Sequence, residues 1–190
     1  MQDYYNRNSI EFFNGTLNAD MTPHYKEFLK FIPKKGHILD AGCGSGRDTY
    51  MFKSYGYNVT AFDGSLEMCK LSSKYLKQEV LHIKFQDIEF NELFDGIWAS
   101  ASLLHISSNE IQMVLKKIQK ALKKDGVLYA SFKYGEFEGM RNGRYFKDYT
   151  EKMANELFSS ANFKLIKIWI TNDVRKEHKN EKWINILGKK

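Results

Sequence analysis

The chain has 190 residues, of which 43% are hydrophobic and 27% charged, an ordinary globular composition that excludes disordered and fibrous classes. Its formal net charge is +6, but the basic residues are spread along the chain without a long run, which favours a solvated surface over a nucleic-acid site. The two cysteines lie outside any CxxC pair, which predicts a reduced, cytoplasmic protein. We find no N-terminal signal pattern and no apolar run of about 20 residues, so no signal peptide and no membrane span are expected.

The first 34 residues are expected to be helical in pieces, with Pro23 and Pro33 marking the breaks. Beyond them, five short apolar runs without polar alternation are typical of strands buried on both faces of a sheet. These predicted strands span residues 37–40, 58–63, 81–86, 94–100 and 127–133. Helical repeats fit between them, and such strand–helix alternation predicts a parallel sheet covered by helices.

Capping signals locate two of those helices. Ser65 can cap a helix that carries Met68. Ser107 and Glu110 have the spacing of a capping box, and Asp125-Gly126 is predicted to end the helix that follows them. One helix is therefore expected after the second predicted strand and another after the fourth.

The pattern changes after Tyr134. A loop over 135–149 precedes a helix near 150–161, and a charged loop joins two strand-like runs over 163–171 and 183–188. These two runs predict a hairpin that completes the sheet. The expected fold is α/β, a Rossmann-like three-layer sandwich with a seven-stranded, mostly parallel sheet and an antiparallel strand in the C-terminal hairpin.

A glycine-rich segment over 39–48, Leu-Asp-Ala-Gly-Cys-Gly-Ser-Gly-Arg-Asp, carries the chemistry. It follows a predicted strand and opens a helix. Its glycines allow the backbone to approach a ligand closely, and the helix N-terminus offers free amides. Such a loop can hold a nucleotide cofactor, although a dinucleotide-binding fold begins in the same way.

Two details distinguish this loop from an NAD site, and a third suits either cofactor. The glycine spacing is Gly-x-Gly-x-Gly rather than Gly-x-Gly-x-x-Gly. Asp40 precedes the first glycine by two positions, and its carboxylate would repel a pyrophosphate but attract the ammonium of an amino acid. Asp63 ends the second predicted strand, where it can accept both hydroxyls of a ribose, so it indicates a nucleoside without choosing the cofactor.

The chain resembles class I S-adenosylmethionine-dependent methyltransferases, and more closely a bacterial branch of tellurite-resistance-type methyltransferases. The resemblance rests on the glycine loop and on residues 61–65 (Ala-Phe-Asp-Gly-Ser), 94–98 (Phe-Asp-Gly-Ile-Trp), 103–105 (Leu-Leu-His) and 142–146 (Asn-Gly-Arg-Tyr-Phe). It implies an enzyme that uses S-adenosyl-L-methionine. It also implies one methyltransferase domain over 1–190, with a helical cover over 1–36, a cofactor-binding core over 37–133 and a substrate-side region over 134–190.

The resemblance further implies roles for individual residues. From the methionine end of the cofactor to its adenine, these are Asp40, Gly42, Gly44 and Gly46 at the methionine moiety, Ala99 and Ser100 facing it, Asp63 at the ribose hydroxyls, Gly64 and Met68 against ribose and adenine, and Asp87 and Ile88 at the adenine. Tyr5 would close over the sulfonium. Several of these residues have a structural alternative: Asp63 and Asp87 as turn or capping residues, Met68 and Tyr5 as ordinary packing.

Two loops, 135–149 and 172–182, are expected at the carboxyl edge of the sheet, where such folds bind ligands. They carry Arg144, Tyr145 and Arg175, which we expect to bind an anionic or polar methyl acceptor, unless the arginines are only solvated. His105 follows the fourth strand on the same side. It is a candidate general base, or else a structural histidine bound to a backbone carbonyl.

Motifs for other acceptors are missing. No Asn/Asp-Pro-Pro-aromatic run and no Pro-Cys pair follows the fourth strand, which disfavours methylation of nucleobase amino groups and of cytosine C5. Neither cysteine has the setting of a nucleophile, and no acidic or histidine cluster predicts a metal site. The short loops favour a small-molecule acceptor bound by a monomer or homodimer. RNA or protein is the alternative acceptor, and a non-catalytic cofactor- or NAD-binding module is the alternative class.

Overall fold

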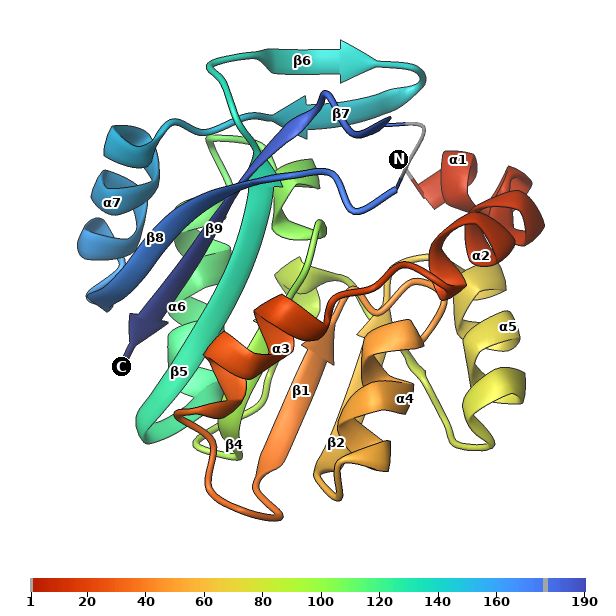
Figure 1. Ribbon diagram of the computed structural model, residues 1–190, viewed down its shortest axis with the longest axis horizontal. Coiled ribbons are helices and arrows are strands. Elements are labelled where there is room, and N and C mark those ends of the chain that lie inside the picture. Colours follow the sequence, from red (N-terminus) through yellow and green to blue (C-terminus); the bar gives the residue numbers. More distant parts are fainter. Residues whose placement is uncertain (1, 176–177) are drawn as a thin grey trace.

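Seven strands form one twisted sheet in the order β3-β2-β1-β4-β5-β9-β8 in the computed structural model, which describes residues 2–175 and 178–190 (Figure 1). The strands are β1 (His37–Ala41), β2 (Asn58–Asp63), β3 (Leu81–His82), β4 (Phe94–Ala99), β5 (Leu122–Lys133), β8 (Lys164–Asn172) and β9 (Lys182–Lys189). The first five run parallel, whereas β9 pairs antiparallel with both β5 and β8. The expected Rossmann-like sheet with a C-terminal antiparallel strand is confirmed.

Helices cover both faces of the sheet, which makes three layers (Figure 1). They are α1 (Gln2–Arg7), α2 (Ser9–Leu17), α3 (Thr22–Leu29), α4 (Arg47–Ser54), α5 (Leu66–Leu76), α6 (Ile111–Ala121) and α7 (Glu151–Ser160). Within the described part of the chain, none of these helices is long and apolar enough to cross a bilayer.

Alternate residues of the central strands feed two separate cores, as the period of a strand requires. Leu39, Ile97 and Leu128 pack with the apolar stripes of α6 and α7. Their neighbours Ile38 and Trp98 point the other way and pack with α3 and α4. Because both faces are buried, the strands are continuous apolar runs, and this is why the sequence pattern located them.

Three local expectations differ from the structure. The third strand ends at His82 and is followed by a 3-10 turn, η1 (Phe85–Asp87), because only residues 81 and 82 pair with β2. Helix α6 ends at Ala121 rather than at Asp125-Gly126. Asp125 instead has a φ of 65° inside β5, where the pairing with β4 shifts register between Phe94 and Gly96. At the start of α6, the Ser107 hydroxyl donates to the Glu110 carboxylate at 2.8 Å, and no backbone amide donates to the serine side chain as the predicted capping box requires.

The segment predicted as a loop over 135–149 contains a second, two-stranded sheet. β6 (Glu138–Arg141) and β7 (Arg144–Lys147) pair antiparallel beyond the carboxyl end of β5, next to the N-terminal helices (Figure 1). Its turn lies against α1, since a Cβ at Gly143 would be 3.4 Å from the Tyr4 ring. The hairpin therefore forms one wall at the carboxyl edge of the main sheet.

Candidate functional site

Two adjoining cavities lie at the carboxyl ends of the parallel strands. The first, of about 330 Å³, is lined by the loops after β1, β2, β3 and β4. The second, of about 440 Å³, is lined by α1, α2, the hairpin β6–β7 and the loop between β8 and β9. Both volumes suit small ligands. The residues that line both cavities are Tyr5, Phe12, Thr16, Arg47, Ser100, Ala101 and His105.

The glycine loop forms the floor of the first cavity and is held by backbone hydrogen bonds. The amides of Gly42 and Cys43 both donate to the Phe62 carbonyl, at 3.0 and 2.9 Å. Gly42 has a φ of +76°, and a Cβ there would lie 2.6 Å from the Cβ of Ser102. Only glycine meets both conditions without strain. The loop therefore turns tightly and lines the cavity through Gly42, Cys43 and Gly44.

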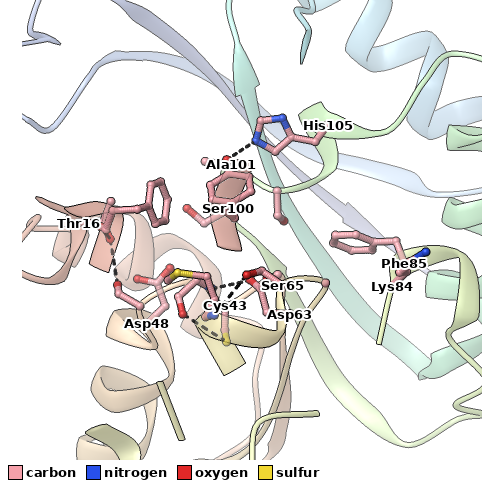
Figure 2. A pocket seen from close by; sticks show the side chains of 18 of the residues that line it. Thr16, Cys43, Asp48, Asp63, Ser65, Lys84, Phe85, Ser100, Ala101 and His105 are labelled. Carbon is pink, nitrogen blue, oxygen red and sulfur yellow. Dashed lines mark hydrogen bonds between the residues drawn. The ribbon is translucent and has the colours of Figure 1, made fainter. Parts of the chain in front are cut away.

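Asp63 stands at the end of β2 and ties that loop to the next one. Its carboxylate accepts hydrogen bonds from the amides of Gly44 at 2.9 Å and Ser65 at 2.8 Å. Burial raises the pKa of the Asp63 carboxyl, while the amide donors act in the opposite direction. Ser65 in turn caps α5 by accepting from the Met68 amide, as predicted. Asp63 lines the first cavity, where its free lone pairs can receive hydroxyl donors (Figure 2).

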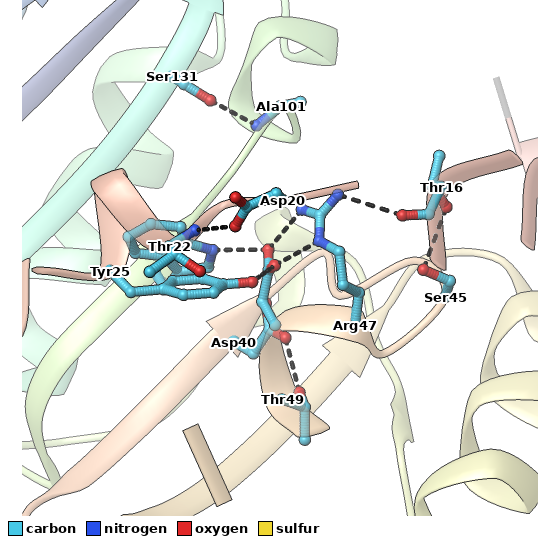
Figure 3. Close-up of polar contacts among 12 residues, drawn as sticks. Thr16, Asp20, Thr22, Tyr25, Asp40, Ser45, Arg47, Thr49, Ala101 and Ser131 are labelled. Atoms are coloured by element: carbon cyan, nitrogen blue, oxygen red, sulfur yellow. Dashed lines mark hydrogen bonds and ion pairs between the residues drawn. The ribbon is translucent and has the colours of Figure 1, made fainter. Parts of the chain in front are cut away.

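Under the glycine loop lies a buried polar cluster (Figure 3). The Asp48 carboxylate accepts from the Arg47 guanidinium at 2.6 and 2.9 Å, from Trp98 Nε1 at 2.8 Å and from the Tyr25 hydroxyl at 2.5 Å. Burial alone would raise the pKa of Asp48, but the Arg47 charge and these donors hold it below its usual value. The cluster therefore keeps one full ion pair beside the cavities.

Asp40 lies below the loop and does not line either cavity. It accepts a 2.6 Å hydrogen bond from the Thr49 hydroxyl, and burial, with the nearby Asp48 charge, raises its pKa to about 8. Thr16 joins α2 to the same region, because its hydroxyl donates to Ser45 and its carbonyl accepts from Arg47. Asp40 is thus placed to support the loop rather than to touch a ligand.

The structure sorts the other predicted cofactor residues into two groups. Those that line the first cavity are Tyr5, Gly42, Gly44, Asp63, Gly64, Met68 and Ser100. Those that do not are Gly46, Asp87, Ile88 and Ala99. A Cβ at Gly46 would meet Leu76 of α5, and Asp87 is exposed beyond the cavity. Because β3 is short, the lining passes instead through Lys84, Phe85 and Gln86 (Figure 2).

Phe12 and Thr16 were not found from the sequence. They come from α2, which lies far along the chain from the glycine loop, and no local motif marks them. Lys84, Phe85 and Gln86 were missed by a few positions only, since the sequence placed the site at the next two residues. The first omission reflects tertiary packing and the second an error in where a strand ends.

His105 is held between two partners at the boundary of the cavities. Its Nδ1 is 2.7 Å from the Tyr145 carbonyl, and its Nε2 is 2.8 Å from the Tyr5 hydroxyl. A carbonyl only accepts, so Nδ1 carries the proton and Nε2 accepts from Tyr5. Burial lowers the pKa of His105 to about 4, which keeps the ring neutral near pH 7. This geometry supports the structural alternative for His105, bound to a backbone carbonyl.

Arg144, in β7, and Arg175, in the loop between β8 and β9, both line the second cavity, but their charges have different partners. Arg175 donates to Asp173 through Nε at 3.0 Å and Nη2 at 2.7 Å. The Arg144 guanidinium lies over aromatic rings, 4.7 Å from the Tyr4 centroid and 5.0 Å from that of Phe146. Its charge is therefore held by rings, whereas that of Arg175 is matched by a carboxylate.

Tyr145 lines neither cavity, although the sequence suggested it for the acceptor site. Its hydroxyl donates to Glu138 on the exposed side of the hairpin. Side chains alternate along a strand, so if Arg144 and Phe146 face inward, Tyr145 faces outward. Its contribution to the site is the backbone carbonyl that binds His105.

Among the described residues, no group of three or more acidic, histidine or cysteine side chains is arranged to hold a metal ion.

Known proteins to which this chain is similar in sequence are described as methyltransferases. A family model described as a methyltransferase domain matches residues 39–130. An uncharacterized methyltransferase of Staphylococcus carnosus is 28% identical over 162 residues, which cover 77% of this chain and 78% of that protein. A ubiquinone biosynthesis O-methyltransferase of Rickettsia akari is 27% identical over 116 residues, and these cover 58% of this chain but only 44% of that protein.

Solved structures with a similar fold include one that covers 99% of this chain. It is the 1,6-didemethyltoxoflavin-N1-methyltransferase of Burkholderia thailandensis, solved with 1,6-didemethyltoxoflavin and S-adenosylhomocysteine bound. It matches with a TM-score of 0.80 over 99% of this chain and 84% of that chain. Sequence identity is 21%, so this likeness bears on the fold alone.

Proposed function

We propose that this chain, which is a class I S-adenosylmethionine-dependent methyltransferase, transfers a methyl group to an N, O or S atom of a small molecule bound in the second cavity. The class rests on the methyltransferase-domain match and on relatives named as methyltransferases. The small-molecule acceptor is our proposal. The observation that carries it is the second cavity, about 440 Å³ in volume and sharing its boundary with the first. The Burkholderia enzyme shows that a similar fold can bind a small molecule, 1,6-didemethyltoxoflavin, together with S-adenosylhomocysteine.

Two finer assignments are part of the same proposal. We treat residues 1–190 as one methyltransferase domain, because the second cavity draws on segments from α1 to the loop after β8. We also assign the chain to the tellurite-resistance-type branch, on its sequence motifs alone. Neither assignment changes the chemistry that follows.

The first cavity has the groups that the cofactor needs. Asp63 offers a carboxylate for ribose hydroxyls, the loop through Gly42 and Gly44 offers backbone beside the methionine moiety, and Met68 with Phe85 offers apolar surface for the adenine. Asp40 would act through the loop that it supports. S-adenosyl-L-methionine supplies a methyl group already activated by its sulfonium. What remains for the chain is to bind, to orient and to exclude water.

Tyr5 and His105 would position the acceptor rather than remove its proton. The Tyr5 hydroxyl occupies His105 Nε2, and a histidine with a pKa of about 4 is a weak base at neutral pH. Burial also raises the pKa of Tyr5. We therefore propose His105 as a positioning residue that fixes Tyr5 at the boundary of the two cavities.

The proposal is tested by incubating the protein with S-adenosylmethionine labelled in its methyl group and a metabolite extract, then identifying labelled products by mass. We expect label in the small-molecule fraction, and less of it with an Asp63→Ala variant when the cofactor is below saturation. Label found only in RNA or protein would replace the small-molecule proposal by the macromolecular alternative. Equal calorimetric binding of S-adenosylhomocysteine and NAD would contradict the cofactor assignment of the first cavity.

A further inference from the structure

We infer that the acceptor is a small aromatic acid, bound as its anion with its negative charge on Arg144. The inference rests on the proposed function, because it names the substrate class of the same second cavity. It differs from the sequence-based expectation, in which Arg144 and Arg175 act together. The structure separates the two arginines by their partners.

Charge balance in the second cavity singles out Arg144. Among the described residues of this lining, every lysine and arginine other than Arg144 faces a carboxylate, and so does His178. The pairs are Arg47–Asp48, Lys133–Glu181, Arg141–Asp148, Arg175–Asp173 and His178–Glu181. Across residues 2–175 and 178–190, Arg144 forms no ion pair. Glu11, the remaining carboxylate of the lining, is exposed on α2.

The guanidinium of Arg144 is also poorly satisfied. Its Nε is buried and has no hydrogen-bond acceptor within the described chain. Within the described residues, the one hydrogen bond of this guanidinium runs from Nη1 to the Tyr5 hydroxyl over a long 3.4 Å. A guanidinium has five donors, and a partly buried charge without a counter-charge is costly. An anionic ligand would supply the missing acceptors and charge together.

Rings hold the Arg144 guanidinium and form much of the wall around it. It lies over Tyr4, Tyr5 and Phe146 at 4.7, 5.9 and 5.0 Å from the ring centroids. These contacts fix the plane of the guanidinium group, which can bind a carboxylate or similar anion through two parallel hydrogen bonds. Further rings that line the cavity are those of Phe12, Tyr129 and Trp183. Aromatic walls of this kind favour a flat, unsaturated acceptor over an aliphatic one.

The position of Arg144 connects the anion to the reaction. Its hydrogen-bond partner Tyr5 lines both cavities and binds His105, which lines both as well. An acid held on Arg144 therefore lies at the boundary of the two cavities, next to the cofactor. Arg175 instead donates to Asp173, which also accepts from Trp183 Nε1, so its charge is already matched. This is why the charge of the acceptor is assigned to Arg144 alone.

The test compares acids with their neutral amides on protein saturated with S-adenosylhomocysteine. Benzoate against benzamide and nicotinate against nicotinamide are titrated by calorimetry. We expect each acid to bind at least about tenfold more tightly than its amide, and Arg144→Gln to weaken acid binding by about tenfold or more while changing amide binding little. Arg7→Gln is the matched control, since it removes the same charge from an exposed residue that lines neither cavity.

Unchanged binding of S-adenosylhomocysteine to Arg144→Gln establishes that the variant is folded. Equal binding of acids and amides to the unmodified chain would overturn the inference. So would an acid preference that survives Arg144→Gln, or one that Arg7→Gln abolishes equally. Labelled products from the extract without an acid preference would refute this inference alone, and an acid preference without any labelled product would refute the proposed function alone.

Discussion

The two cavities adjoin, yet they are built in opposite ways. The floor of the first is held by backbone hydrogen bonds between neighbouring loops: the loop after β1 donates to the end of β2, and Asp63 accepts from an amide of each flanking loop. The second is made by side chains that meet from distant parts of the chain. Tyr5 binds His105 from 100 positions away and Arg144 from 139 positions away.

The contrast indicates which cavity determines specificity. A site made of main-chain atoms in a tight loop depends on a few glycines and one carboxylate, so it suits a cofactor that never changes. A site made of side chains from a helix, a hairpin and a loop can be altered one residue at a time. Substitutions that change one of the two cavities can therefore be used to measure whether the other cavity is affected.

The largest effect is expected at the glycine loop. Gly42→Ala adds a methyl group 2.6 Å from the Ser102 Cβ at a φ of +76°. We expect the variant to lose about 3 kcal/mol or more of unfolding free energy, together with binding of S-adenosylhomocysteine. Gly15→Ala is the control, because a Cβ at Gly15 has no neighbour within 4 Å and lies in a helix, where alanine adds up to about 1 kcal/mol. Equal stability in denaturant would contradict the close packing assigned to Gly42.

The next largest effect is expected from acid, through the protonation of His105 on the acceptor side. The folded pKa of His105, about 4, lies below its ordinary value of 6.5, so the unfolded chain takes up the proton first as the pH falls. Stability from this group is complete above pH 6.5 and is lost by pH 4, to a total of about 3 kcal/mol. In His105→Gln this loss is absent. The difference in unfolding free energy between the two proteins should therefore narrow by that amount.

His24 serves as an internal control for that measurement. Burial lowers its pKa too, and it is present in both proteins, so its titration cancels in the comparison. A difference in unfolding free energy that stays constant between pH 6.5 and 4 would show that His105 is charged or exposed in the folded protein.

A smaller effect is expected at the ribose position. Asp63→Ala removes the acceptor of two backbone amides and the carboxylate that faces the first cavity. We expect affinity for S-adenosylhomocysteine to fall by about 1–3 kcal/mol in calorimetry, with the fold intact. Glu67→Ala removes the same charge from α5 outside both cavities and should bind normally. Unchanged affinity in folded Asp63→Ala would move the ribose elsewhere.

The smallest effect is expected at Tyr145, whose hydroxyl meets Glu138 on the exposed side of the hairpin. Tyr145→Phe should change turnover less than about twofold and stability by no more than about 0.5 kcal/mol. Tyr5→Phe deletes a hydroxyl that joins Arg144 to His105 and should slow turnover more. If Tyr145→Phe were the slower of the two, the outward placement of Tyr145 would be wrong.

The same contrast explains what could be predicted from the sequence. The strands of the core and the glycine loop were located because their signals are local, namely apolar runs and closely spaced glycines. The hairpin β6–β7 was not found, since its strands are four residues each and carry Glu138, Arg141, Arg144 and Lys147 rather than an apolar pattern. Without the hairpin, the alternation that turns Tyr145 outward could not be derived.

Pairings across the chain were also beyond the sequence. Both arginines could be placed at the correct edge of the sheet, but not the partner of each. Asp173, two positions from Arg175, gives no sign that it neutralises that side chain instead of turning to solvent. Tyr4, which lies under Arg144, is in the first helix. Such contacts depend on how elements pack, and periodicity carries no information about them.

The rings of Tyr5 and Phe12, which line both cavities, have a thermodynamic consequence. Any shift of these rings that one ligand stabilises alters the surface offered to the other, so the two binding equilibria are coupled. Reciprocity then requires that the factor by which the cofactor changes affinity for the acceptor equals the factor by which the acceptor changes affinity for the cofactor. The degree of inhibition by S-adenosylhomocysteine therefore depends on the concentration of the acceptor as well as on that of S-adenosylhomocysteine itself.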